Sequence, residues 1–264
     1  MTDLAPAQSV FLPSPARVER EPRQLRAWTL LLMSGITICF ASIVMLIAGA
    51  LTFFRARRLY RGMARGLSLF ILRLYGIRIR VHRAETLPAV QTVFVSNHTS
   101  SLDLFVLVAL GLPNSRFFLS GFLRKLIPLG IISWMLGTFF TVPQDRPHER
   151  LKIFQRAERV LRRTGESVYL SPEGGRVTTR EIGRFNKGAF HLAMSLQAPI
   201  VPFYIRIPAE VDPRLGFDAR PGIVDVFFLP AIETREWTMA ELSGNIASVR
   251  RVMTRAHQEL SCAP

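Results

Sequence analysis

Apolar and polar positions follow three different patterns in the first third of the chain, and each predicts a different element. Residues 28–54 contain no charged side chain, and this run is longer than the ~20 apolar residues that a helix needs to cross a bilayer. Residues 59–75 mix arginines with apolar residues at near-helical spacing, which predicts an amphipathic helix ending at Gly76. Residues 77–82 alternate strictly, which predicts a half-exposed strand.

Beyond residue 90 the pattern switches repeatedly between short β-branched or aromatic runs and helical runs. We expect strands that start at residues 93 and 167, and further strands over residues 115–120, 198–205 and 223–229. We expect helices over residues 102–110, 148–163 and 185–197, and a region of helix and turn over residues 122–140. Thr238 and Glu241 form a capping-box signature that opens a last helix. This alternation, over 264 residues, predicts one α/β domain with an appendage.

These patterns divide the chain into three parts. Residues 1–27 are rich in proline and end in arginines, so we expect a disordered basic tail. Residues 28–76 form the apolar membrane segment and a basic helix beside it, and residues 77–264 form the α/β domain. The stretch 48–50 resembles a signal-peptide cleavage site, but the apolar run before it exceeds the 7–15 residues typical of a signal core.

Two topologies fit the apolar segment, because arginines flank it on both sides. A single transmembrane helix has its carboxyl-terminal side in the cytoplasm, as the arginines after residue 54 weakly favour. A re-entrant hairpin broken near Gly35 has both ends on one membrane face and also satisfies both flanks.

The formal net charge of +15 narrows the class of partner. Of the 34 basic residues 31 are arginines, which points to phosphate substrates, a membrane surface or nucleic acid, although genomic base composition also raises arginine content. A nucleic-acid binder would present basic patches with interleaved aromatics on a recognised module, so we expect no nucleic-acid partner. Cys39 and Cys262 have neither metal-ligand spacing nor the pattern of a disulfide framework.

The first candidate chemistry lies where the strand starting at residue 93 gives way to a helix. His98 and Asp103 are five residues apart, so on one helix they would point about 140° apart. If Thr99, Ser100 or Ser101 caps the helix, His98 precedes it and Asp103 occupies its first turn, where its carboxylate can reach the imidazole. Such an Asp fixes the tautomer of a general-base histidine. The alternative is that Asp103 only serves the helix dipole.

The second candidate stretch follows the strand that starts at residue 167. Glu173, Gly174, Gly175 and Arg176 form a turn at the end of that strand. Glycines let the backbone approach a ligand closely, and an arginine suits bidentate phosphate binding. Taken alone, this sequence is more typical of an ordinary surface turn than of a binding site.

The order of the motifs resembles the glycerophospholipid acyltransferase family, with 1-acylglycerol-3-phosphate acyltransferases as the nearest branch. The resemblance covers roughly residues 58–230 and rests on Asn97-His98-x4-Asp103, Pro172-Glu-Gly-Gly-Arg176, Phe185-x-Lys-Gly-Ala-Phe190 and Pro199-Ile-Val-Pro202. It implies a glycerol-3-phosphate acyltransferase-like fold, in which helices flank a mixed β-sheet and residues 77–264 form the catalytic domain.

The resemblance also implies an activity: a fatty acyl group moves from an acyl-CoA or acyl-carrier-protein thioester to the hydroxyl of a lysophospholipid. His98 would be the general base and Asp103 its orienting acid, while Arg146, Glu173, Gly174, Gly175 and Arg176 would bind the acceptor. We expect no cofactor and no metal, contact with membrane lipids, and an inner-membrane location with a cytoplasmic catalytic domain.

Three departures from the family pattern keep the acceptor open. Ser171 and Gly175 replace a phenylalanine and a hydroxyl residue, and Gly121 stands where the family often has a lysine, with Lys125 nearby. Another lysolipid, such as a lyso-aminolipid, is therefore an alternative acceptor. A thioester hydrolase and a non-catalytic membrane lipid-binding protein are the remaining alternatives.

Overall fold

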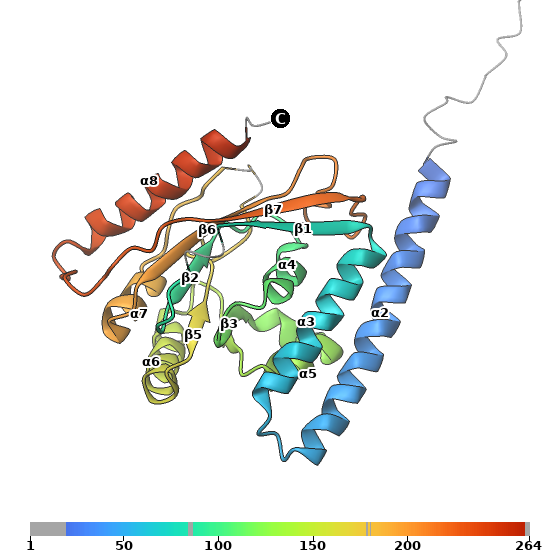
Figure 1. Cartoon of the computed structure of the whole chain (residues 1–264), viewed down its shortest axis with the longest axis horizontal. Helices are drawn as coiled ribbons and strands as arrows, with labels where there is room; N and C mark the ends of the chain where they lie inside the picture. Colours follow the sequence, from blue (N-terminus) through green and yellow to red (C-terminus); the bar gives the residue numbers. More distant parts are fainter. Residues whose placement is uncertain (1–19, 84–86, 178, 180, 262–264) are drawn as a thin grey trace, which may run out of the picture.

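A mixed β-sheet forms the centre of the structure (Figure 1). The computed structural model describes residues 20–83, 87–177, 179 and 181–261, and these contain one seven-stranded sheet in the order β1-β7-β6-β2-β5-β3-β4. The strands are β1 Ile77–His82, β2 Val93–Ser96, β3 Ser115–Ser120, β4 Phe139–Thr141, β5 Ser167–Tyr169, β6 Ile200–Arg206 and β7 Gly222–Phe228. Strands β6, β2, β5, β3 and β4 run parallel, and β7 and β1 run opposite to them. The expected α/β class with a mixed sheet is thus confirmed.

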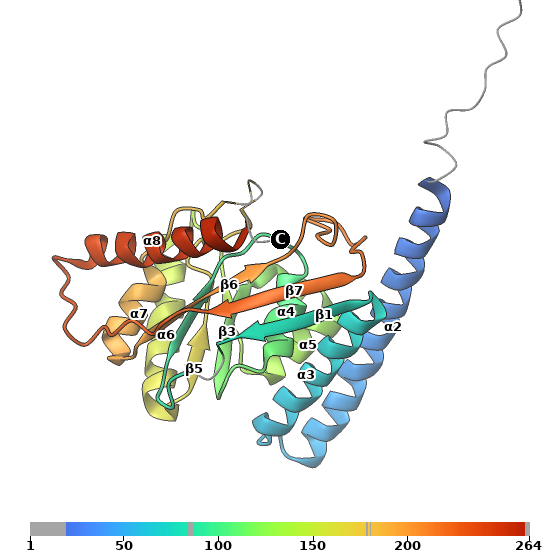
Figure 2. The ribbon, with the colours of Figure 1, turned by 45° about the horizontal axis from the view of Figure 1, so that its top comes forward.

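Helices cover both faces of this sheet (Figure 2). Helices α3 Arg57–Leu74, α4 Asp103–Leu110 and α5 Ile127–Met135 pack on one face, with the 3-10 helix η2 Gly121–Lys125 before α5. Helices α6 Pro147–Thr164, α7 Gly188–Leu196 and α8 Leu242–Ser261 pack on the other. The central strand β2 serves both cores, because successive side chains of a strand point to opposite faces. Phe94 lies in the core beneath α3 and α4, while Val93 and Val95 lie in the core beneath α6 and α7.

Helix α2 Arg20–Leu51 extends beside α3 and α5. Its side chains at 34, 38, 42 and 45 are buried, and these positions form one stripe of the helix. The opposite side is apolar but exposed, as at Phe40 and Ile47. Residues Gln24–Leu51 are long and apolar enough to cross a membrane, yet only 17% of their most apolar window is buried. Helix α2 is therefore a candidate membrane segment rather than a core helix.

The amino-terminal boundary of this segment needs correction, and the structure has no break at Gly35, the position at which one of the two open topologies placed it. Helix α2 begins at Arg20, although the sequence predicted an unstructured tail up to residue 27. Pro22 lies in the first turn, where the N–H that proline lacks has no intrahelical acceptor. The rest of the predicted tail, residues 1–19, lies outside the described residues, as does Cys262. Helix α2 also continues through Gly35, and the chain reverses only over residues 52–56.

Two other predicted helix starts shift by a few residues. Helix α8 begins at Leu242, and the capping-box residue Thr238 donates from Oγ1 to Glu241 Oε2 at 2.9 Å instead of capping a backbone N–H. Helix α7 begins at Gly188 rather than residue 185, because the backbone N–H of Asn186 is bonded to the carbonyl of Pro172, 2.7 Å away. That long-range bond holds residue 186 in a loop.

The sheet topology places one strand end at a switch point. From β2 the chain passes through α4 to β3 on one side of β2, and it returns from β5 through α7 to β6 on the other side. In open α/β sheets a crevice forms outside the carboxyl ends of the strands at such a point. The residues that follow β2 and β5 meet there, and they are the two candidate stretches of the sequence.

Candidate active site

The loop that carries His98 is fixed to the end of strand β6 by its neighbour Asn97. The buried amide of Asn97 donates from Nδ2 to the carbonyl of Ile205 at 3.0 Å and accepts from the Ile205 N–H at 2.8 Å. Ser96 Oγ, one residue earlier, lies 3.0 Å from the buried Tyr169 hydroxyl, and burial raises the pKa of that phenol. These bonds end strand β2 and place the imidazole just beyond the sheet.

His98 and Asp103 are in direct contact. His98 Nδ1 lies 2.7 Å from Asp103 Oδ2, and the side chain of His98 is 30% exposed while that of Asp103 is 1% exposed. Asp103 Oδ2 also accepts the backbone N–H groups of Thr99 at 2.9 Å and Ser100 at 3.0 Å. The predicted geometry is present, because Asp103 is the first residue of α4 and its carboxylate bends back over the preceding loop.

The cap of helix α4 differs from the expectation that Thr99, Ser100 or Ser101 occupies the N-cap position. Leu102 occupies it, with Ser100 Oγ accepting the Leu102 N–H at 3.2 Å. Ser101 instead donates from Oγ to the carbonyl of Gly216 at 2.7 Å. The serines thus hold the loop between β2 and α4, and Ser101 ties it to the loop that follows β6.

Glu173 connects the two candidate stretches. Its Oε2 accepts the backbone N–H of His98 at 2.7 Å, and its Oε1 accepts that of Gly183 at 2.8 Å. Burial raises the pKa of this carboxyl, and the two backbone N–H groups oppose the rise. Both oxygens therefore contact N–H groups of the protein itself, and Glu173 positions the backbone of His98.

The turn of residues 173–177 packs closely around its first glycine. Gly174 has φ 71°, and a Cβ there would lie 2.7 Å from Asn186 Nδ2 and 2.9 Å from Gln144 Nε2. Asn186 Nδ2 donates to the carbonyls of Pro172 at 3.1 Å and Glu173 at 2.9 Å. Gly175, in contrast, has no heavy atom within 4 Å of its Cβ position. Position 174 therefore requires glycine, whereas position 175 has room for a side chain.

The two arginines predicted to bind the acceptor are exposed. The Val177 N–H donates to the carbonyl of His98 at 2.8 Å, which holds the residue after Arg176 against the histidine loop. Arg176 makes no hydrogen bond or ion pair within the described residues. Arg146 precedes α6, and its Nη1 lies 3.7 Å from Glu149 Oε1 with both side chains more than half exposed. Gln144 brings that loop against Gly174, so both arginines lie near the turn.

The structure shows what surrounds the residues that depart from the family pattern, namely Gly121 and Ser171. A Cβ at Gly121 would lie 2.7 Å from the backbone carbonyl oxygen of Thr141, so a lysine does not fit there without movement of β4. Lys125 is exposed on η2. Ser171 Oγ is buried with no hydrogen-bond partner among the described residues. No cluster of three or more His, Cys, Asp or Glu side chains that could hold a metal ion occurs in the described part of the chain.

Three positioning residues were not predicted from the sequence: Asn97, Gln144 and Asn186. Asn97 is the first residue of the motif that contains His98, and Asn186 is the unspecified second residue of the motif that starts at Phe185. Their place within these motifs was the available signal, but it did not indicate a positioning role. Their bonding partners are 13 to 108 residues away, so no local pattern indicates what the amides contact.

Comparison with known proteins shows similarity to acyltransferases. A family model described as acyltransferase matches residues 78–206. The 1-acyl-sn-glycerol-3-phosphate acyltransferase alpha of Mus musculus is 31% identical over 196 residues, which cover 71% of this chain and 66% of the mouse protein. The protein of the same name from Homo sapiens is 30% identical over 197 residues, covering 73% of this chain and 68% of the human protein. This chain therefore spans about two thirds of these relatives.

A solved structure has a similar fold. The crystal structure of the 1-acyl-sn-glycerophosphate acyltransferase of Thermotoga maritima aligns with a TM-score of 0.76 and covers 93% of this chain and 98% of that protein. At 18% identity, this similarity concerns the fold alone.

Proposed function

The chain belongs to the glycerophospholipid acyltransferase family, and we propose that it transfers a fatty acyl group to the free hydroxyl of a lysophospholipid. The donor is an acyl-CoA or acyl-carrier-protein thioester, the acceptor is 1-acylglycerol-3-phosphate, and the product is phosphatidate. The observation that carries this proposal is the contact of His98 Nδ1 with the buried Asp103 carboxylate at 2.7 Å.

In this proposal His98 is the general base. Its Nδ1 is held by Asp103, and its Nε2 makes no hydrogen bond within the described residues, so Nε2 is available to the acceptor hydroxyl. As the hydroxyl oxygen bonds to the thioester carbonyl carbon, its proton passes to Nε2. The carbon–sulfur bond then breaks, and the leaving thiolate takes the proton from the imidazolium. Asp103 fixes the tautomer and stabilises the imidazolium between these steps.

A thioester is already activated, so the proposed reaction uses neither a covalent intermediate nor a cofactor. General-base catalysis contributes typically 10²–10⁴-fold, and holding the two substrates together supplies much of the remainder. We therefore expect transfer to continue in the presence of EDTA. Arg176 and Arg146 would bind the acceptor phosphate, as their exposure and their place beside the His98 loop support.

The acceptor has one structurally supported alternative. The contact of a Cβ at Gly121 with the Thr141 carbonyl excludes a side chain at the position where the family often has a lysine. With one cation fewer, the site would hold a phosphate monoester less tightly. A different lysolipid, such as a lyso-aminolipid, is therefore the second candidate acceptor.

We further propose that helix α2 anchors the protein in the inner membrane, with the catalytic domain on the cytoplasmic side. The apolar exposed surface of α2 supports insertion. The arginines that follow α2, at positions 55, 57 and 58, support the orientation, because positively charged flanks favour the cytoplasmic side. The lysolipid then reaches the active site from the membrane surface.

The test is acyl transfer by the detergent-purified chain. Radiolabelled acyl-CoA and acyl-carrier protein are each offered with a panel of lysolipids that includes lysophosphatidate. We expect a diacyl product from the wild type and a loss of at least 10²-fold in His98→Ala. His191→Ala is the control, because His191 is an exposed histidine of α7 that lies outside the site.

The product separates the alternatives. Free fatty acid as the main product would indicate a thioester hydrolase. Equal transfer by wild type and His98→Ala would exclude His98 as the base, and absence of transfer with every donor and acceptor pair would favour a non-catalytic lipid-binding protein.

A further inference from the structure

Arginines gather at the edge of the sheet opposite His98. A cavity of about 510 Å³ opens there, lined by Phe54, Arg55, Arg57, Arg116, Arg156, Val160, Arg163 and Thr164. Five of these eight residues are arginines, and no acidic residue lines the cavity. Such a concentration of one charge favours an anionic ligand.

The strand directions separate this cavity from the catalytic loop. Arg116 lies near the amino end of β3, and Arg163 and Thr164 end the helix that leads into β5. Strands β3, β5 and β2 are parallel, so their amino ends share one edge, while His98 follows the carboxyl end of β2. The cavity arginines are therefore not the arginines that we assign to the acceptor.

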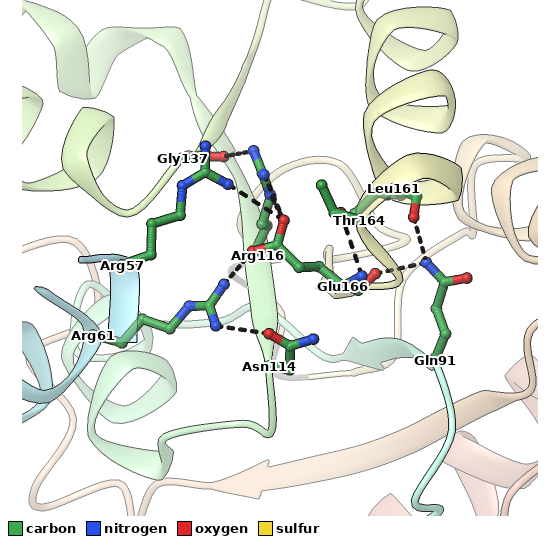
Figure 3. A network of polar contacts seen from close by, with 9 residues as sticks. All are labelled: Arg57, Arg61, Gln91, Asn114, Arg116, Gly137, Leu161, Thr164 and Glu166. Carbon is green, nitrogen blue, oxygen red and sulfur yellow. Dashed lines mark hydrogen bonds and ion pairs between the residues drawn. The ribbon is translucent and has the colours of Figure 1, made fainter. Parts of the chain in front are cut away.

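Behind the cavity lining, one carboxylate pairs with two of the lining arginines (Figure 3). Glu166 accepts from Arg116 Nε at 2.5 Å and from Arg57 Nη1 at 3.3 Å, and it also pairs with Arg61. Arg116 and Glu166 are buried, with side chains 6% and 9% exposed. A single negative charge thus faces three positive ones, and the wall keeps a net positive charge.

The outer wall adds three arginines whose side chains have no partner in the described part of the chain. The guanidinium groups of Arg55, Arg156 and Arg163 make no hydrogen bond or ion pair within the described residues. Arg156 and Arg163 lie on one face of α6 together with Val160, because residues spaced by four and three positions are neighbours on a helix. Three guanidinium groups at the rim are therefore free to bind an anion.

The surroundings of the cavity indicate where that anion comes from. Phe54, in the cavity wall, follows the apolar helix α2 and makes an edge contact with Trp134, with ring centroids 5.5 Å apart. Phe53 is 81% exposed and Trp134 is 58% exposed. An exposed tryptophan beside the end of an apolar helix, like Trp134, is typical of the headgroup level of a bilayer, where arginines meet anionic lipids.

We propose that this arginine cavity binds the phosphate of an anionic phospholipid headgroup. The lipid presents its phosphate to Arg55, Arg156 and Arg163, while its acyl chains lie along the exposed apolar side of α2. The site goes beyond acyl transfer and does not depend on it, because it lies at the other edge of the sheet and its test measures binding alone.

The test uses the full chain in neutral detergent micelles. Binding of phosphatidylglycerol and of phosphatidylcholine is titrated by native mass spectrometry for wild type and for the double variant Arg156→Gln/Arg163→Gln. We expect the wild type to prefer phosphatidylglycerol by about tenfold or more, and the double variant to lose that preference, since each arginine near a membrane surface contributes measurably to anionic-lipid binding.

A matched double variant controls for net charge. Arg159→Gln/Arg255→Gln removes the same two charges from exposed positions outside the cavity, and we expect it to keep the wild-type preference. A third arm adds 10 mM inorganic phosphate, which we expect to leave phosphatidylglycerol bound because free phosphate lacks acyl chains.

Four results would overturn the proposal. One is equal binding of the two lipids by the wild type, and another is loss of the preference in the control variant as well. A third is complete displacement of the lipid by inorganic phosphate, which would indicate a site for free anions. The fourth is a raised KM for acyl-CoA in the cavity variant with unchanged lipid binding, which would assign the cavity to the phosphates of the donor.

Discussion

At the residue scale, three separate parts of the chain hold His98, namely the start of α4, the turn of residues 173–177 and, through Asn97, the end of β6. Asp103 contacts its imidazole, Glu173 accepts its backbone N–H, and Val177 donates to its carbonyl. Asn97, the preceding residue, is bonded to Ile205 through both polar atoms of its amide. The backbone and the ring of the proposed base are therefore both fixed before any substrate binds, which is the preorganisation that a general base needs.

Glu173 offers a direct test of this arrangement. In Glu173→Gln the amide nitrogen would face one of the two N–H groups that the carboxylate now accepts, so one hydrogen bond is lost. Hydrogen bonds to charged groups contribute about 1.5–3 kcal/mol. We expect kcat to fall at least tenfold with little change in KM, because the base is displaced while Arg146 and Arg176 remain. Steady-state kinetics in detergent measure this.

Glu181→Gln is the control, since Glu181 is an exposed carboxylate of the same loop.

The pH dependence of stability adds a second readout for Glu173. Burial raises the pKa of Glu173, so the folded state binds a proton more readily than the unfolded state does, and the contribution of Glu173 to stability falls as the pH rises through its folded-state pKa. We therefore expect the melting temperature of wild type, measured relative to that of Glu173→Gln, to fall as the pH rises. Unchanged kcat would contradict the positioning role.

At the element scale, the close packing of β3 against β4 determines which residues fit at the end of β3. Ser120 is paired with Thr141, and Gly121 follows directly, under the Thr141 carbonyl. Helix α3 shows the opposite situation, because Gly62 has no heavy atom within 4 Å of its Cβ position. The same substitution should therefore have opposite effects at the two glycines.

We expect Gly121→Ala to destabilise the fold by about 1–3 kcal/mol, because its Cβ would force the two strands apart. We expect Gly62→Ala to stabilise it by about 0.5–1 kcal/mol, since alanine costs less backbone entropy in a helix. Thermal denaturation of both variants in the same detergent measures the difference. If Gly121→Ala melted at or above the wild-type temperature, the close approach of the Thr141 carbonyl would not explain why residue 121 is glycine instead of the lysine that the family often has.

At the scale of the whole molecule, Glu166 joins segments that are far apart in the sequence. It follows α6, and its partners Arg57 and Arg61 lie on α3 while Arg116 lies on β3 (Figure 3). Gln91, just before β2, also donates to its backbone carbonyl at 2.7 Å. The amino edge of the sheet and the helix next to the membrane segment thus share one buried carboxylate.

Glu166→Gln should therefore be strongly destabilising. Removing one partner of a buried ion pair typically costs about 3–5 kcal/mol, because the remaining charge stays buried without compensation, and Arg116 is buried in this way. Thermal inactivation of acyl transfer measures the effect, with Glu233→Gln as the exposed control. A variant as stable as the control would mean that water replaces the carboxylate at this edge.

The sequence by itself determined the local elements and the identity of the candidate site. The alternating and helical patterns of 77–82, 115–120 and 148–163 predicted β1, β3 and α6 closely, because burial of one face imposes the period of the element on the sequence. The spacing of His98 and Asp103 predicted their contact, since that contact depends only on a local bend. Their catalytic roles stay predictions.

Only the tertiary structure decided what lies next to these elements. The bonds of Glu173 to His98, of Asn97 to Ile205 and of Glu166 to three arginines join residues 50 to 109 positions apart. Periodicity reports which face of an element is buried, not which element covers it. From the sequence, Arg55 and Arg57 were interpreted only as the basic flank of the apolar segment, and Arg116, Arg156 and Arg163 only as part of the high net charge. The order of the strands and the turn between α2 and α3 bring them together.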